Sequence, residues 1–133
     1  MSKIEYYGKI DAILYNNAYK KILQQYINNI LTATNENDDN ITWYICREED
    51  LPNTEMKKIL LEKERKMTGI ASLQYGRSIT ANNQIWISLS AIKTALFSNP
   101  HEETILIHVI IDELAHIKTQ KDHGDQEYEK KYN

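Results

Sequence analysis

Asp112, Glu113 and His116 are the residues of this chain whose types and spacing are best suited to chemistry. Asp112 and His116 are four positions apart, and Glu113 and His116 are three apart, so a helix would project all three from one face. Carboxylates and imidazoles bind zinc, and a carboxylate near the ion can take a proton from water. We therefore expect a metal site with His116 as a ligand and Glu113 in the position of a general base.

The segment that holds these residues is strongly apolar. Its aliphatic residues are Ile105, Leu106, Ile107, Val109, Ile110, Ile111, Leu114 and Ile117. They are distributed around the whole circumference of a helix, which is typical of a buried helix. A buried charge normally pairs, ligates a metal or becomes neutral. We therefore expect Asp112 to be a second ligand, and the alternative is an ion pair between Asp112 and His116 that binds no metal.

Two further histidines lie close to this set in the sequence. His123 is followed by Gly124, where a turn would return an imidazole to the helix, so we expect it to be the third ligand. The alternative is a surface histidine in a polar loop. His108 lies about 12 Å from His116 along a helix axis, too far to share an ion. We expect it instead to hydrogen-bond to Asp112 and orient it.

These residues resemble the minimal zinc peptidase domains of the SprT-like and WLM group, which carry a His-Glu-x-x-His helix and a later histidine. The segments 69–73, 85–90 and 104–116 also follow in the order that those domains show. The resemblance implies a zincin-like fold, zinc as cofactor, His116 and His123 as ligands and Glu113 as general base. The chain departs from the pattern at Asp112, where the family has its first histidine, and at Tyr128, an aromatic one residue later than expected.

The remaining sequence predicts the elements that position this site. In chain order we expect a helix at about 9–33, a strand at 41–47, a helix from Asn53 or Thr54 to about 66, strands at 69–75 and 84–89 joined by a polar turn at 76–83, a helix at 91–97 capped by Ser90, the motif helix starting at Asn99, and a short last helix within 125–133. This order predicts an α+β fold, with an antiparallel sheet of about three strands packed against helices and a central buried motif helix.

Length and composition limit the class of protein. The 133 residues suit one domain, residues 1–133, and the formal net charge of −3 argues against direct nucleic-acid binding. The single cysteine, Cys46, excludes an intramolecular disulfide and a cysteine-rich zinc ribbon. The N-terminus lacks the apolar core of a secretory signal, and the longest apolar run, 105–111, is interrupted by His108 and is too short to span a membrane. We expect a soluble cytoplasmic protein.

The sequence thus predicts a zinc-dependent metallopeptidase acting on protein or peptide substrates. Glu113 would take a proton from the attacking water and pass it to the leaving amine. The substrate would lie extended between the motif helix and the strand near 85–89. Two alternatives remain open: an inactive zincin-like module that keeps only a binding or structural role because of Asp112, and a metal-dependent hydrolase of a non-peptide substrate.

Overall fold

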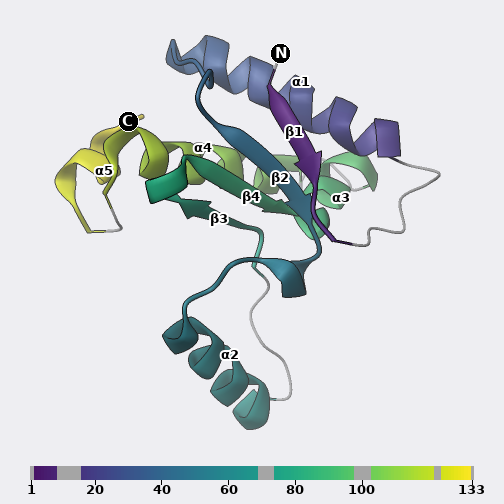
Figure 1. The fold of residues 1–133 in the computed structure, drawn as a ribbon, viewed down its shortest axis with the longest axis vertical. Coiled ribbons are helices and arrows are strands. Elements are labelled where there is room, and N and C mark those ends of the chain that lie inside the picture. Colours follow the sequence, from purple (N-terminus) through teal and green to yellow (C-terminus); the bar gives the residue numbers. More distant parts are fainter. Residues whose placement is uncertain (1, 9–15, 69–73, 98–102, 122–123, 133) are drawn as a thin grey trace.

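The computed structural model describes residues 2–8, 16–68, 74–97, 103–121 and 124–132. These residues form an α+β fold with five α-helices and a four-stranded sheet (Figure 1). The elements are β1 (Lys3–Tyr6), α1 (Asn16–Thr34), β2 (Thr42–Cys46), the 3-10 turn η1 (Glu48–Asp50), α2 (Glu55–Thr68), β3 (Gly76–Ile79), the 3-10 turn η2 (Thr80–Asn82), β4 (Gln84–Ser88), α3 (Leu89–Phe97), α4 (Glu103–Thr119) and α5 (Gln126–Lys130). Among the described helices, none combines the length and apolar character needed to cross a membrane.

The sheet is mixed, with strand order β1-β2-β4-β3. β1, β2 and β4 run parallel, and β3 pairs antiparallel with β4 at one edge. The prediction of an antiparallel sheet of about three strands was therefore wrong in strand number and direction. The sequence prediction missed β1, which pairs in parallel with β2 through the long crossover that contains α1. The two predicted strands β2 and β4 are also parallel to each other.

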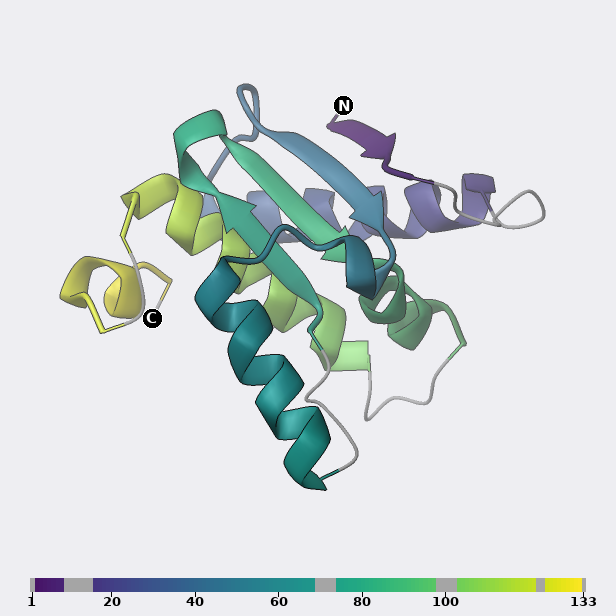
Figure 2. The same ribbon diagram turned by 60° about the horizontal axis from the view of Figure 1, so that its bottom comes forward.

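The main core lies between the sheet and three helices. α1, α3 and α4 contact one another, and α3 and α4 contact the sheet (Figures 1 and 2). Alternate strand residues face these helices and are fully buried, as the period of two along a strand requires: Trp43, Ile45, Ile85 and Ile87. The α4 residues Leu106, Ile110 and Leu114 meet them with no exposed surface. This packing fixes α4 against the sheet.

The opposite face of the sheet carries a smaller apolar cluster. Cys46, Leu51 and Trp86 are buried there, and Tyr44 stacks on Trp86 with ring centroids 4.4 Å apart. η1 follows β2 after one residue, and residues 51–54 connect η1 to α2. α2 itself extends away from the body of the molecule (Figures 1 and 2).

Several predicted elements are confirmed, with shifted ends. The strand predicted at 41–47 is β2, and the strand predicted at 84–89 is β4. Thr54 caps α2, because its Oγ1 accepts a hydrogen bond from the Lys57 N–H at 3.2 Å. α3 is capped by Ser88 and not by Ser90, since the Ser88 Oγ accepts from the Ala91 N–H at 3.3 Å. The short last helix is α5, which begins after Asp125.

The region 69–83 was predicted incorrectly. The segment 76–79 is strand β3 and not part of a turn, and the turn is confined to η2 and Asn83, whose φ of 52° lies in the left-handed region. Gly76 explains why a strand fits there. A Cβ at this position would lie 2.7 Å from Val109 Cγ1 and 3.1 Å from the Trp86 carbonyl oxygen, so only glycine lets β3 pack this closely on α4. The strand predicted at 69–75 lies largely outside the described residues, as do the start of the long N-terminal helix and the Asn99 cap.

Candidate metal centre

Asp112, Glu113 and His116 converge on one side of α4 near its C-terminal end. One ligand atom from each lies within 4.8 Å of the others. Glu113 and His116 are buried, with 7% and 9% of their surfaces exposed, and Asp112 is half-buried. The predicted one-turn spacing therefore does bring the three together, and the cluster could hold a metal ion.

The His116 side chain is held by contacts on two sides. Its Nδ1 lies 2.8 Å from the Lys121 main-chain carbonyl oxygen. A carbonyl only accepts, so Nδ1 donates this hydrogen bond, and Nε2 is the ring nitrogen nearer to Asp112. The ring also stacks on the buried Tyr128 of α5, with centroids 4.3 Å apart and planes 13° apart. Two independent contacts thus fix the imidazole, as in metal sites where neighbouring groups orient the ligand.

Glu113 is the most perturbed ionisable group of the site. The pKa of its carboxyl is raised from 4.5 to about 7, chiefly by burial; the Ser78 hydroxyl opposes this rise, the Asp112 carboxylate adds to it, and the Arg77 charge opposes it. Ser78 Oγ donates to Glu113 Oε2 and lies 3.0 Å from the Glu113 main-chain oxygen. A carboxyl that titrates near neutrality suits proton transfer at physiological pH.

Asp112 and His116 lie one turn apart on the same face of α4. The Oδ2 of Asp112 is 3.9 Å from His116 Nε2, too long for a hydrogen bond and longer than the roughly 3.3 Å that separates two ligands of a tetrahedral zinc ion, so the two side chains would have to move closer together to share one. The side chain of Asp112 is 38% exposed and that of His116 11%. The donor types therefore suit a zinc ion: an imidazole nitrogen and carboxylate oxygens, with one atom from each of the three residues within 4.8 Å of the others.

The three residues open into a cleft of about 430 Å³. It is bordered by α4, β3, the start of α2 and the residues between them: Asn53, Lys57, Gln74, Gly76, Arg77, Ser78, Thr80, Asp112, Glu113 and His116. The prediction that the cleft lies between the motif helix and the strand near 85–89 was wrong, because no residue of that strand lines it. β3 pairs outside β4 and packs on α4, so β3 forms the wall.

Two further residues were predicted to belong to the site, His123 and His108. His123 falls outside the described residues. His108 is exposed and borders a separate hollow of about 490 Å³ that Asp112 also reaches, and within the described part of the chain no hydrogen bond joins His108 to Asp112. α4 is also not buried on all sides, because Thr104 and His108 are exposed.

Sequence reasoning missed the residues that support the site from outside α4. Ser78 and Gly76 were assigned to a turn, although a glycine within a strand commonly marks close backbone approach. Asn53 was considered only as a helix cap. Its Oδ1 is buried in the cleft wall without a hydrogen-bond partner among the described residues. The positions of these three residues beside the metal centre depend on contacts between segments that are distant in the sequence.

The chain was compared with protein-family models, with curated proteins and with solved structures, and none of the three comparisons found a match.

Proposed function

We propose that this protein is a zinc-dependent peptidase in which Asp112 and His116 hold the ion and Glu113 is the general base. The observation that carries the proposal is the convergence of Asp112, Glu113 and His116 in one open cleft, with the His116 Nδ1 proton already committed to Lys121. His123 remains the proposed third ligand. A bound zinc ion would supply Lewis acidity toward a peptide carbonyl and a water molecule.

Glu113 would carry the proton during hydrolysis. Its carboxylate takes a proton from the attacking water, and the acid then returns that proton to the leaving amine. Ser78 supports this role because its hydroxyl donates to Oε2 and fixes the carboxyl against β3. Arg77 on the same strand lowers the pKa of Glu113 and so favours the basic form.

β3 provides a place for an extended substrate. The Ser88 N–H donates to the Tyr75 carbonyl oxygen at 2.8 Å, so Arg77 and Ile79 also direct their main-chain groups toward β4. The main-chain groups of Gly76 and Ser78 then project to the other side of the strand. A peptide adding to this edge would place its backbone along the cleft that holds Glu113.

The test is cleavage of an unfolded protein by the zinc-supplemented protein and by Glu113→Gln. Glu5→Gln is the matched control, since Glu5 is exposed on β1 at the far edge of the sheet. We expect Glu113→Gln to abolish cleavage, Glu5→Gln to leave it unchanged, and Asp112→His to preserve or raise it. Full activity of Glu113→Gln would remove Glu113 as the base. Zinc binding without any cleavage by the natural protein would favour the inactive binding module.

A further inference from the structure

α2 is unusual among the helices of this protein because none of its residues is buried. It runs for 14 residues away from the body of the molecule (Figures 1 and 2). Four of its large apolar side chains are exposed to solvent: Met56 by 66%, Ile59 by 48%, Leu60 by 54% and Met67 by 85%. We call these four residues the outer stripe.

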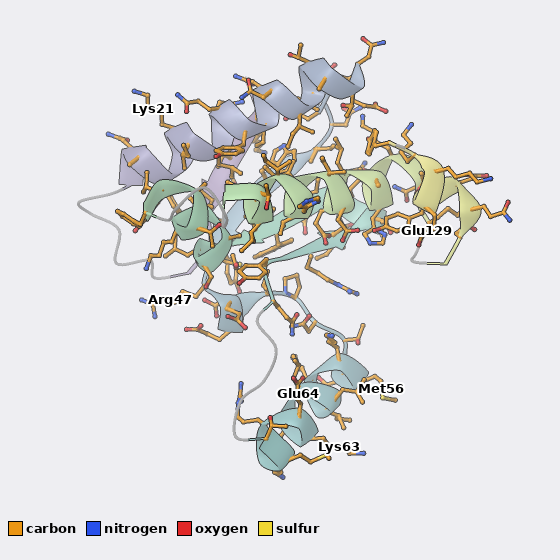
Figure 3. All side chains as sticks on the ribbon, turned by 180° about the vertical axis from the view of Figure 1, so that it is seen from behind. Lys21, Arg47, Met56, Lys63, Glu64 and Glu129 are labelled. Carbon is orange, nitrogen blue, oxygen red and sulfur yellow. The ribbon has the colours of Figure 1, made fainter. Side chains whose placement is uncertain are left out.

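The outer stripe lies along one side of α2. Ile59 and Leu60 follow Met56 by three and four positions, and Met67 follows it by eleven, about three turns. Lys63 extends from the same side of the helix as Met56 (Figure 3), so one charged side chain lies among the apolar ones of the stripe. An amphipathic helix normally turns its apolar side to the core. Here the half-buried Leu61 lies in the hollow shared with Leu51 of the body, and the outer stripe is left to solvent.

The stripe adjoins the cleft of the metal centre. Asn53, which precedes α2, and Lys57, in its first turn, both line that cleft together with Glu113. Leu60 of the stripe follows Lys57 by three positions, so the two side chains are neighbours on the surface of the helix. A chain that leaves the cleft along α2 would therefore meet the outer stripe next.

Two properties of α2 decide between occupants. The outer stripe has four side chains, whereas a stable interface takes roughly 20–30 residues from each partner. α2 carries five Lys or Arg residues and three Glu residues. Lys58 pairs with Glu55 at 3.6 Å and Arg65 with Glu62 at 3.5 Å, so part of the basic charge that a membrane-surface helix would offer to lipid is paired within the helix. A weak, adaptable contact with another polypeptide fits better, and the two methionines suit it because their side chains adjust to varied apolar partners.

We propose that the outer stripe binds apolar side chains of an unfolded or extended polypeptide whose adjoining backbone occupies the cleft. The inference rests on the proposed function, because it gives the substrate class of that site. The natural substrate is then a polypeptide that exposes apolar residues beside the bond to be cut. Folded proteins, which bury such residues, are poor substrates.

The test measures binding without cleavage, in a Glu113→Gln background. The probe is a fluorescein-labelled 16-residue peptide with leucines alternating with serine and glycine, and a second peptide has serine in place of each leucine. The stripe variant is Met56→Gln with Leu60→Gln and Met67→Gln, because glutamine has nearly the same helix propensity as leucine and methionine. The control variant is Glu55→Gln with Lys58→Gln and Lys66→Gln on the same helix.

We expect fluorescence anisotropy to show roughly tenfold or greater weakening of leucine-peptide binding by the stripe variant, and no comparable weakening by the control. The serine peptide should bind weakly and equally to all. Circular dichroism checks the fold, and the single Leu60→Gln variant, expected to weaken binding about threefold, serves if the triple variant is misfolded.

Unchanged leucine-peptide binding by a folded stripe variant would overturn the inference. It would also be overturned if sedimentation showed a dimer of the natural protein that the stripe variant dissolves, or if the stripe were needed for binding phosphatidylserine vesicles but not the peptide. Because the background is Glu113→Gln, loss of binding supports the inference even if the natural protein cleaves nothing. Normal cleavage by the natural protein together with unchanged binding removes this inference alone.

Discussion

Gly76 offers the sharpest test of how β3 and α4 are held together at the site. In Gly76→Ala the new methyl would lie 2.7 Å from Val109 Cγ1, 3.1 Å from the Trp86 carbonyl oxygen and 3.3 Å from Glu113 Cγ. Contacts between carbon atoms are optimal at about 3.5–4.0 Å, so the closest one is too short by about 1 Å. β3 and α4 must separate or Val109 must move.

The expected cost of Gly76→Ala is about 1–2 kcal/mol of unfolding free energy. Overpacking of this kind costs about 1–3 kcal/mol, and the reduced freedom of the unfolded chain offsets about 0.4–1 kcal/mol. Val109→Ala should relieve the shortest contact, since it removes the Cγ1 methyl. The loss of unfolding free energy in the double variant should therefore be smaller, by at least about 1 kcal/mol, than the sum of the losses in the two single variants.

Urea denaturation of the four proteins, with a chelator present throughout, measures this coupling. Equal slopes for the four transitions would show that the midpoint differences report stability. The refuting results are a Gly76→Ala protein as stable as the natural one, or single effects that add without coupling. Either would mean that β3 does not pack on α4 at this distance, and the Ser78 to Glu113 contact would lose its support.

Three further predictions concern the burial and contacts of Glu113, Cys46 and Tyr128. In the metal-free protein the pKa of Glu113 is higher in the folded state than in the unfolded state, so the folded state binds more protons. The free energy of unfolding should therefore fall by about 2 kcal/mol or more as pH rises from about 4.5 to about 7. Denaturation curves of Glu113→Gln should lack this fall. Burial raises the pKa of the Cys46 thiol to about 12, so this thiol should not react with a disulfide reagent at pH 8 until denaturant is added, and rapid reaction in the native protein would contradict its placement. Tyr128→Ala should weaken zinc binding about tenfold in a competition titration while Tyr128→Phe keeps it, because the stacked ring orients His116; equal affinities of the two variants would count against that role.

The parts of the fold that could be predicted are those whose pattern is local. The alternation of Trp43 and Ile45 with Thr42, Tyr44 and Cys46 identified β2. β4 followed from the alternation of Ile85 and Ile87 with Trp86 and Ser88. The grouping of Asp112, Glu113 and His116 followed from helical spacing alone. In each case one element sets the geometry, so sequence separation determines distance.

The parts that were missed depend on contacts between distant segments. β1 is short, and its strand conformation depends on parallel pairing with β2 beyond α1. β3 begins with Gly76 and includes the polar Arg77 and Ser78, so its intrinsic strand propensity is low, and pairing with β4 and packing on α4 outweigh it. Because β3 was missed, the hydroxyl that holds Glu113 and the wall of the cleft were missed as well.

Zinc content tests the central claim most directly. The natural protein and His116→Ala are each supplemented with zinc at neutral pH, freed of unbound metal, checked for folding by circular dichroism and assayed for zinc per chain. The account predicts about one zinc per chain for the natural protein and almost none for folded His116→Ala. A natural protein with far less than one zinc per chain, or a folded His116→Ala variant that retains the ion, would contradict it.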